Sequence, residues 1–361
     1  MIERLKRLLS EALVGTTTAA AAFPRAEWRT VLEPESVEFR DVVAPPFVPE
    51  ADELKPSHYV TPRAVSAPLD GALYYSYLNV LMTRRRSVLL ETDNTYLEHP
   101  GNAAAEKFYW RNLYFQRIVD VPGVSFVMRS PANNFYHTLA DNLPRLYALQ
   151  QPRYRDTQIA LLVPGSLQPF EEYFLALLLP ENVKVGKVER NRLHRLERVI
   201  FSSYLSRQMS GYLPRKYLEF FLERTLPSRP RQKRNRIYIT RRPSKVGRRI
   251  LNEAEVSLVA ERFGFQSCAL EELPLSAQIE LFFDAEAVIA AHGAGLTNLL
   301  FADGIGVVEL HPTQRVFPHY YFLCQAMGHR YRFVCSDAVM RHSDFTVDTK
   351  ALTARLSELL D

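Results

Sequence analysis

Apolar and polar positions form their most informative pattern over residues 288–311, which read VIAAHGAGLTNLLFADGIGVVELH. An apolar run stops at a turn that contains two glycines, and a second apolar run begins soon afterwards. The pattern predicts a buried strand over 288–291, a tight turn over 292–295, a short helix over 296–302 and a second strand over 307–310. Together these segments form a compressed βαβ unit.

The turn in this unit has the composition of an anion site. Gly293 and Gly295 let the backbone approach a ligand, and free amides at the start of the helix point where a phosphate would bind. Glu309 ends the second strand, where α/β sheets place ligand-contacting side chains, so it is a candidate for holding ribose hydroxyls. A short glycine motif taken alone is equally compatible with an ordinary turn.

The rest of the chain alternates apolar strands with amphipathic helices from about residue 72 onward, which predicts an α/β protein. In the first half we expect strands over 87–91, 124–128, 159–163 and 199–201, and helices over 135–149 and 170–179. In the second half we expect strands over 236–240, 265–269 and 287–291, and helices over 253–263, 276–283 and 352–360.

The length of 361 residues exceeds what one hydrophobic core usually serves, so we predict more than one domain. Residues 1–70 are expected to form an N-terminal helix and an extended lead-in with few regular elements. An N-terminal α/β domain follows over 71–226, and a C-terminal α/β domain with a closing helix over 227–361. The first helix is amphipathic and fits a membrane surface, its own protein or a partner chain.

Composition and cysteine content indicate the cellular compartment of the protein. Hydrophobic residues make up 47% and charged residues 24%, as in ordinary globular proteins. Neither a disulfide framework nor a CxxC zinc pattern is formed by the three cysteines, Cys268, Cys324 and Cys335. No apolar run approaches the roughly 18 residues of a membrane span, and the N-terminus lacks the apolar core of a signal peptide. We therefore expect a cytoplasmic protein, with peripheral membrane contact as an option.

The net charge of +5 is modest, but basic residues cluster around the strand predicted over 236–240. Arg241 and Arg242 follow this strand directly, and Lys245 comes after a proline turn. Cations at the carboxyl edge of a sheet can neutralise a diphosphate without a metal. For a charge run alone, a solvated linker face is the ordinary alternative.

The first half contains a second group of chemically capable residues within SPANNFYHTLADNLPRLYAL. Asn134, His137 and Asp141 follow one another at helical spacing and therefore share a face. Asp141 can fix the tautomer of His137, or can itself take a proton from an acceptor hydroxyl. Helix capping by an asparagine and a structural His–Asp hydrogen bond are the plain alternatives. Pro144 predicts a kink.

Three blocks of the chain, taken in order, resemble a known family. They are NFYHTLADNLPRL, YITRRPSKVGRRILNEAEV and HGAGLTNLLFADGIGVVELHP. At these separations they are similar to the signature blocks of the glycosyltransferase family 61 catalytic domain. That family includes bacterial capsular and exopolysaccharide enzymes, plant xylosyltransferases and arabinosyltransferases, and animal N-acetylglucosaminyltransferases that act on proteins.

The resemblance implies a GT-B-like fold, with two Rossmann-like domains facing each other across a cleft, and inverting transfer with no obligatory metal or cofactor. The co-substrate would be a nucleotide sugar, expected to be UDP-linked, and the acceptor a growing surface glycan or glycolipid. Asp141 or His137 would act as base, beside Asn134 on the acceptor side. The donor would be held by Arg241, Lys245, His292, Gly293, Ala294, Gly295, Leu296, Thr297, Asn298 and Glu309.

Two further functions deserve comparison. Asp284 and Glu286 resemble the acid-x-acid site of metal-dependent glycosyltransferases, and such a pair would suit Mn²⁺ or Mg²⁺ if it faced a cleft. We favour the simpler interpretation, in which the pair ends a helix just before the strand that begins at Val288. A non-catalytic protein that binds polyanions through its arginines is the other alternative. We expect no nucleic-acid partner, because no recognition motif or interleaved aromatic pattern accompanies the basic run. Oligomeric state, sugar and linkage are left open.

Overall fold

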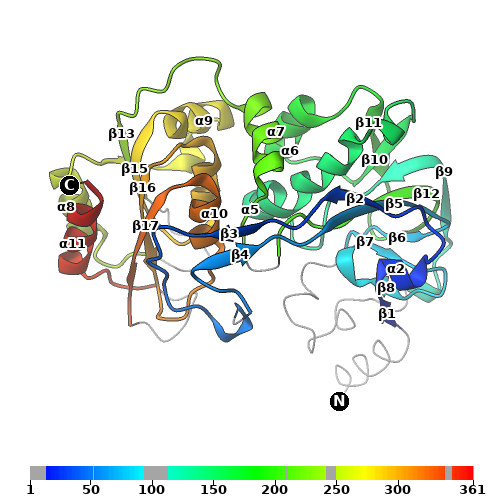
Figure 1. Cartoon of the computed structure of the whole chain (residues 1–361), viewed down its shortest axis with the longest axis horizontal. Coiled ribbons are helices and arrows are strands. Elements are labelled where there is room, and N and C mark those ends of the chain that lie inside the picture. The colour runs from blue at the N-terminus through cyan, green and yellow to red at the C-terminus, as the bar shows by residue number, and fades with distance from the viewer. Residues whose placement is uncertain are drawn as a thin grey trace. The chain divides into compact units, whose positions relative to one another are not determined.

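A computed structural model describes residues 14–51, 53–92, 113–207, 210–240, 249–337 and 344–360. The chain divides into two compact units (Figure 1). Unit 1 comprises Met1–Pro34 and Pro62–Gln208, and unit 2 comprises Glu35–Thr61 and Met209–Asp361. Each unit is therefore assembled from segments that are separate in the sequence. The α/β class predicted from the sequence is confirmed.

Unit 1 is built on a mixed sheet that has ten strands among the described residues. Strand β12 lies at its centre, parallel to β9 on one side and antiparallel to β5 and β6 on the other. Strands β9, β10 and β11 continue in parallel. The strands are β1 (Thr16–Thr17), β2 (Arg29–Leu32), β5 (Ala64–Asp70), β6 (Leu73–Tyr75), β7 (Val80–Met82), β8 (Val88–Leu89), β9 (Val119–Phe126), β10 (Ile159–Pro164), β11 (Val183–Val188) and β12 (Leu193–Ser202).

The helix predicted over 135–149 is present but changes type twice. It begins as α5 (Phe135–His137), becomes the π-helical turn η4 (Thr138–Asn142), and ends as the 3-10 helix η5 (Leu143–Gln150). Pro144 explains the change, because it has no amide hydrogen to complete an α-helical ladder through this turn. The other helices of unit 1 are α2 (Ala19–Ala22), η2 (Leu90–Thr92), η6 (Pro152–Tyr154) and α6 (Pro169–Leu178).

Unit 2 contains a five-stranded, all-parallel sheet in the order β14-β13-β15-β16-β17. Figure 1 shows α8 and α11 on one side of its strands and α9 and α10 on the other. Its elements are β13 (Asn235–Ile239), α8 (Glu253–Arg262), β14 (Gln266–Cys268), η7 (Leu270–Glu272), α9 (Leu275–Phe283), β15 (Ala285–Ala291), η8 (Ala294–Phe301), β16 (Gly306–His311), α10 (His319–Met327), β17 (Arg330–Cys335) and α11 (Thr349–Leu360).

This strand order is that of a doubly wound nucleotide-binding fold. The chain leaves β13 toward β14 and then returns to the other side of β13 as β15, so the direction of winding reverses between β13 and β15. In open parallel sheets, ligands bind outside the carboxyl ends of the strands at such a reversal. The segments that follow these two strands begin at Thr240 and His292.

The N-terminal segment differs from the extended lead-in predicted over 1–70. Strands β2 and β5 join the sheet of unit 1, whereas β3 (Ser36–Glu38) and β4 (His58–Val60) form a hairpin in unit 2 together with η1 (Pro49–Ala51). The many prolines suggested irregular chain, but most of them lie between these strands. Helix α7 (Arg215–Thr225) belongs to unit 2 as well.

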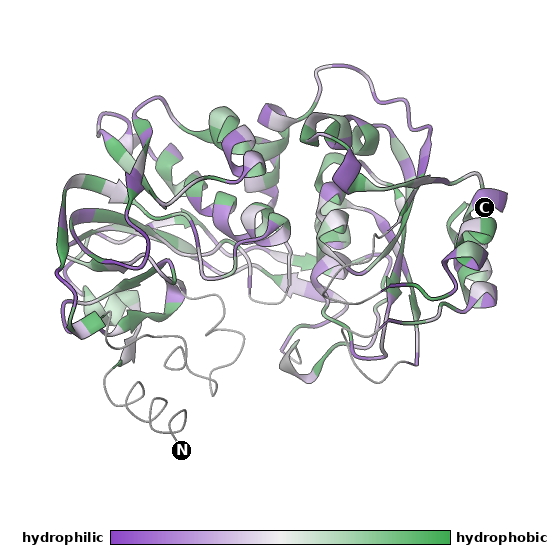
Figure 2. Cartoon of the chain, turned by 180° about the vertical axis from the view of Figure 1, so that it is seen from behind, coloured by the Kyte–Doolittle hydropathy of each residue, from purple (hydrophilic) through white to green (hydrophobic). Residues whose placement is uncertain are grey.

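The hydropathy of unit 2 differs between its sheet and its connecting segments. The strands of unit 2 are largely hydrophobic in Figure 2, whereas the segment between α7 and β13 is mostly hydrophilic. One core cluster packs the sheet of unit 2 against α8 and α11, with Val256, Leu310 and Leu352 among its members. Within the part of the chain that the structure describes, no helix combines the length and apolar character needed to span a bilayer.

Candidate active site

The first group of candidate residues lies in unit 1, where α5 passes into the π-helical turn. His137 Nδ1 and Asp141 Oδ2 are 2.6 Å apart, and both side chains are about one fifth exposed. The sequence predicted this pairing, and the structure confirms that the two side chains meet. Because Asp141 engages Nδ1, the opposite nitrogen, Nε2, is the one that this pairing turns away from the carboxylate.

Capping explains why the helix starts where it does. Asn134 is the N-cap, and its side-chain oxygen accepts a hydrogen bond from the backbone amide of His137 at 3.0 Å. Asn134 therefore has the capping role that is the structural alternative to an acceptor contact. The π-helical turn then brings the side chain of Asp141 against that of His137. Such turns are frequent at functional sites.

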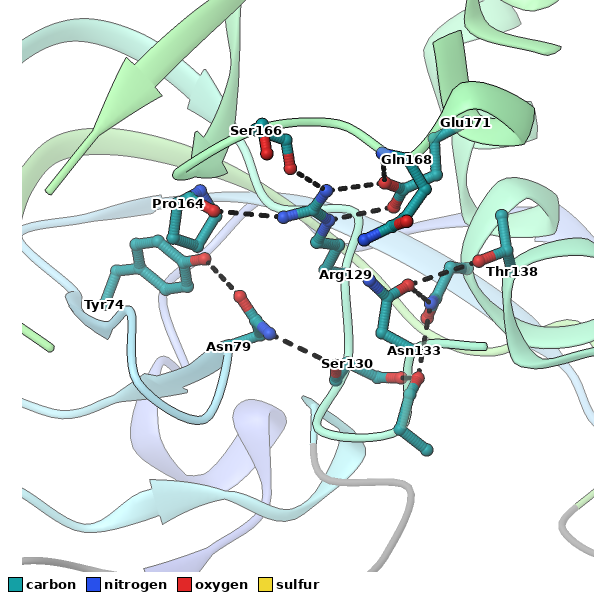
Figure 3. Close-up of polar contacts among 12 residues, drawn as sticks. Tyr74, Asn79, Arg129, Ser130, Asn133, Thr138, Pro164, Ser166, Gln168 and Glu171 are labelled. Atoms are coloured by element: carbon teal, nitrogen blue, oxygen red, sulfur yellow. Dashed lines mark hydrogen bonds and ion pairs between the residues drawn. The ribbon is translucent and has the colours of Figure 1, made fainter. Parts of the chain in front are cut away.

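The loop before this helix is held by polar contacts that Figure 3 shows. Asn133 Oδ1 accepts a hydrogen bond from Thr138 Oγ1 at 3.2 Å, and Ser130 Oγ donates to the carbonyl of Ala132 at 2.8 Å. Tyr74 of β6 donates to Asn79 in the turn before β7, and Asn79 donates to the carbonyl of Ser130. The side chains around His137 and Asp141 are thus anchored to the sheet.

A buried ion pair anchors the same loop from the other side (Figure 3). Arg129 contacts both oxygens of Glu171, at 2.8 and 2.5 Å, and its side chain also donates to the carbonyls of Pro164 and Ser166. Glu171 is fully buried and additionally accepts from the amide of Gln168 at the start of α6. Every oxygen of this buried carboxylate is therefore satisfied, as burial of a charge requires.

A second buried guanidinium lies one helical turn beyond Asp141. Arg145 is 1% exposed and donates to the carbonyls of Ser202 and Met128. Burial lowers the pKa of Arg145, while charge interactions with Tyr204, Tyr74 and Asp141 raise it. Arg145 thus ties η5 to the end of β12 and adds positive charge near the carboxylate of the dyad.

The second group lies in unit 2, at the carboxyl end of β15. Residues 292–295 are partly exposed, whereas the next three predicted residues, Leu296, Thr297 and Asn298, are buried in η8. Only the turn formed by His292, Gly293, Ala294 and Gly295 is therefore accessible. A Cβ atom at Gly295 would lie 3.2 Å from Leu270 Cδ1, so this glycine permits close packing against η7.

Glu309 occupies the carboxyl end of β16 but does not face solvent. It is 0% exposed, and its Oε1 lies 2.6 Å from His292 Nδ1 while its Oε2 accepts from the Tyr331 hydroxyl at 2.7 Å. His311 Nε2 lies 3.1 Å from the same hydroxyl and 3.4 Å from Oε2. The structure thus corrects the expected ribose contact: both carboxylate oxygens are used inside the protein.

The electrostatics of this group favour an ionised carboxylate. Burial alone would raise the pKa of Glu309, but the charge of His311 and the hydrogen bonds from His292 and His311 outweigh it and hold the pKa well below its ordinary value. Burial raises the pKa of the Tyr331 phenol well above its ordinary value, so the phenol keeps its proton and donates it to Glu309.

Among the described residues, His292, Glu309 and His311 form a group that could hold a metal ion. One ligand atom from each of His292, Glu309 and His311 lies within 4.8 Å of the others. Ligand atoms around a tetrahedral zinc lie roughly 3.3 Å apart, given metal–nitrogen distances of about 2.0–2.1 Å. The 2.6 Å contact between His292 and Glu309 is instead a hydrogen-bond distance. In this arrangement the side chains bind one another.

The basic residues near β13 are largely engaged within unit 2. Arg229 pairs with Asp284 and Glu280, Arg236 with Glu286, and Arg249 with Asp344. Arg231 donates to the carbonyls of Phe283 and Phe301. These arginines stabilise the fold, which weakens the interpretation as a polyanion-binding surface. The predicted donor ligands Arg241 and Lys245 lie outside the described residues.

The alternative metal site at Asp284 and Glu286 is not supported by its surroundings. Asp284 caps the end of α9, is 3% exposed, and accepts from two nitrogens of Arg229. Both oxygens of Glu286 accept from Arg236. The two carboxylates also sit at the amino end of β15, the edge opposite to the one where parallel sheets bind ligands.

The family model described as Glycosyltransferase 61 matches residues 135–308, from the start of α5 to the middle of β16. Residues 135–308 belong to glycosyltransferase family 61. The family resemblance predicted from the three sequence blocks is thereby confirmed for this segment.

Two relatives agree with this assignment. The chain is 30% identical over 210 residues to the EGF domain-specific O-linked N-acetylglucosamine transferase of Drosophila melanogaster, covering 51% of this chain and 39% of the relative. It is 27% identical over 204 residues to the Beta-1,2-xylosyltransferase XYXT1 of Oryza sativa subsp. japonica, covering 50% of this chain and 43% of the relative. The matched segment thus spans about two fifths of each relative.

The sequence patterns did not reveal three residues that surround the two candidate groups. Tyr331 and His311 complete the surroundings of Glu309, and Arg129 supports the loop before the dyad. His311 directly follows the VVEL strand, and its position at the strand end was a usable signal. Tyr331 and Arg129 act through partners 22 and 42 residues away, which no local pattern reveals.

Proposed function

We propose that this protein is an inverting glycosyltransferase that moves a sugar from a nucleotide-sugar donor, UDP-linked, to a hydroxyl of a glycan acceptor. The single observation that carries the proposal is the family 61 match, because it begins beside the His137–Asp141 dyad and ends beside Glu309. Both groups of candidate residues are therefore included within, or adjacent to, the matched segment.

In the proposed reaction, the dyad activates the acceptor. Asp141 fixes the ring of His137 through Nδ1, so that Nε2 can take the proton from the acceptor hydroxyl. The oxygen then attacks the anomeric carbon, and the departing nucleotide diphosphate keeps the electron pair of the broken bond. The alternative is that Asp141 takes the proton itself and His137 positions it.

The donor is proposed to bind at the winding reversal of unit 2. The carboxyl ends of β13 and β15 are neighbours there, since Ile239 pairs with Ala290. The segment after β13 carries Arg241 and Lys245, and the segment after β15 is the exposed turn that starts at His292. Cationic side chains and turn amides can absorb the negative charge that develops on the leaving diphosphate.

Further parts of the proposal follow from the resemblance and from the sequence. We propose a GT-B-type use of the two units, with the acceptor served by unit 1 and the donor by unit 2. Charge neutralisation by protein groups would make the reaction independent of a metal. The proposed setting is the cytoplasm or a cytoplasmic membrane surface, in the synthesis of a surface polysaccharide.

The decisive experiment measures donor binding and turnover separately. Wild-type protein should show thermal stabilisation by one nucleotide sugar or nucleoside diphosphate, and turnover that survives a metal chelator. Asp141→Asn should lower kcat by about 10²–10⁴-fold while leaving donor stabilisation intact. The control is Asp156→Asn, an exposed carboxylate of the same unit that should change neither quantity.

Either half of this result can contradict the proposal. Full turnover in Asp141→Asn would remove the dyad from catalysis. Turnover abolished by the chelator and restored by Mn²⁺ would replace the metal-independent mechanism. Binding to heparin-like polyanions with indifference to every nucleotide tested would favour the non-catalytic alternative.

A further inference from the structure

The buried carboxylate behind the donor turn raises a question of charge balance. Glu309 is fully buried, and its oxygens contact two imidazoles and one phenol. Its ion pairs among the described residues are with His292 and His311. An ionised carboxylate removed from water requires a counter-charge at contact distance. Among the described residues, an imidazole can provide it by taking up a proton.

The position of His292 makes it the imidazole that can pass this charge to a ligand. Its side chain is 14% exposed, whereas that of His311 is 3% exposed and shares its Nε2 with the Tyr331 hydroxyl. His292 also directly follows β15, at the winding reversal of the sheet. Its Nδ1 is directed at Glu309, which sets Nε2 on the other side of the ring.

We propose that Glu309, Tyr331 and His311 are positioning residues that hold His292 as a cation oriented toward the donor's diphosphate. The inference rests on the proposed function and deepens it. Glu309 fixes the ring and favours its protonated form, and Tyr331 fixes Glu309. His311 Nε2 lies 3.4 Å from Oε2 and interacts with the charge of the carboxylate from that side. The Nε2–H of His292 then donates to the diphosphate, which is the group that becomes more negative as the glycosyl bond breaks.

Other titratable groups lie around Glu309 and His292. Burial raises the pKa of the Cys324 thiol well above its ordinary value and that of Cys335 to about 12, so both are neutral near pH 7. The ring of His319 is stacked with that of His292, and the ring of Tyr320 meets it edge-on. The groups that face this site from the turn, β16, α10 and β17 are therefore His292, Glu309, His311, His319, Tyr320, Cys324, Tyr331 and Cys335.

The test compares affinities for UDP and for uridine, which lacks phosphates, by calorimetry on the full chain between pH 6 and 9. Glu309→Gln should weaken UDP binding by about tenfold or more and leave uridine binding unchanged, because a charge-assisted hydrogen bond is lost. Tyr331→Phe should weaken UDP binding by about three- to tenfold through the loosened carboxylate. In both variants the pH at which UDP affinity falls should move downward.

A matched control separates this role from general destabilisation. Tyr238 is also buried and donates to a carboxylate of unit 2, Glu253, at 3.0 Å. Tyr238→Phe makes the same chemical change away from the turn and should leave UDP affinity and its pH dependence as in wild type. Thermal unfolding of each variant reports whether it is folded. If Glu309→Gln does not fold, the UDP affinity of Tyr331→Phe still tests the proposal.

Several outcomes decide the proposal. Wild-type UDP affinity and pH dependence in both Glu309→Gln and Tyr331→Phe would overturn the positioning role while leaving the donor assignment intact. Failure of wild type to bind UDP, GDP or ADP would instead remove the proposed function. Tight binding of Zn²⁺ alone, lost in His311→Asn, would also overturn the inference, since it would assign the group to a metal.

Discussion

At the scale of single residues, burial decides the protonation state of a histidine. His329 is 3% exposed; its Nε2 lies 3.0 Å from the carbonyl oxygen of Leu299, and its Nδ1 accepts from the amide of Ile305. Burial lowers its pKa to about 4, because neither hydrogen bond supplies a negative charge. His329 thus bridges the end of η8 to the start of β16 as a neutral ring, in contrast to His292 beside its carboxylate.

This environment predicts a pH-dependent stability. The unfolded chain takes up a proton on His329 near pH 6.5, but the folded protein does so only near pH 4. The contribution is therefore complete above pH 6.5 and is lost as the pH falls, by up to about 3 kcal/mol. Urea unfolding at pH 7 and pH 4.5 should show this loss in wild type and a smaller loss in His329→Gln. Equal losses in the two proteins would contradict it.

The buried pair of Arg129 and Glu171 gives a second prediction at this scale. Glu171→Gln removes the charge partner of an arginine that is 4% exposed, and should lower the free energy of unfolding by about 3–5 kcal/mol. The matched change Glu219→Gln breaks an exposed pair with Arg215 and should cost less than about 1 kcal/mol. Denaturant titrations of the two variants would refute the prediction if they gave similar losses.

At the scale of elements, the π-helical turn is the feature that places the dyad. Pro144→Ala supplies the missing amide hydrogen and should allow η4 and η5 to become regular α-helix. We expect kcat to fall by about tenfold or more, because Asp141 moves relative to His137, with no loss in thermal stability. Pro152→Ala, at the first turn of η6, should change neither. A fully active Pro144→Ala protein would show that the π turn is dispensable.

Elements were predictable where their signal is local. Strand β15 carries an apolar run over 287–291 and strand β16 begins with one over 306–308, so both strands were found within a few residues. Strand β12 spans ten residues, but only 199–201 was predicted, because Arg195, Glu197 and Arg198 interrupt its apolar pattern. These polar residues pair with neighbouring strands, as Arg198 does with Asp70. The site followed the same rule: the turn and the His137–Asp141 contact were predicted from local spacing, whereas Tyr331 and His311 beside Glu309 were not.

At the scale of the whole molecule, unit 2 is completed by a segment from the N-terminal part of the chain. The β3–β4 hairpin of unit 2 places Tyr59 against Tyr212, with ring centroids 4.5 Å apart, and their neighbours include Phe39 and Phe322. Sequence patterns could not reveal this packing, since Tyr59 and Tyr212 are distant in the chain. A boundary drawn at residue 70 therefore could not describe either unit.

This organisation predicts that the N-terminal hairpin is integral to unit 2. Tyr59→Ala should lower the free energy of unfolding by about 3–5 kcal/mol, because Tyr59 is 2% exposed and its ring fills an aromatic core. Tyr77→Ala is the control, since Tyr77 is 51% exposed and should cost less than about 1 kcal/mol. Comparable stability of the two variants would show that the hairpin does not contribute to the stability of unit 2.

The discontinuous make-up of unit 2 also sets the timing of its maturation on the ribosome. Residues 35–61 leave the exit tunnel early, but the strands and helices that cover their aromatic rings are synthesised only after residue 209. Unit 1 has all its segments by residue 208 and can close first, as domains synthesised earlier generally do. Until the residues after 209 have been synthesised, the rings of Phe39, Phe47 and Tyr59 lack the side chains that cover them in the folded unit. We therefore expect residues 35–61 of the nascent chain to bind a chaperone.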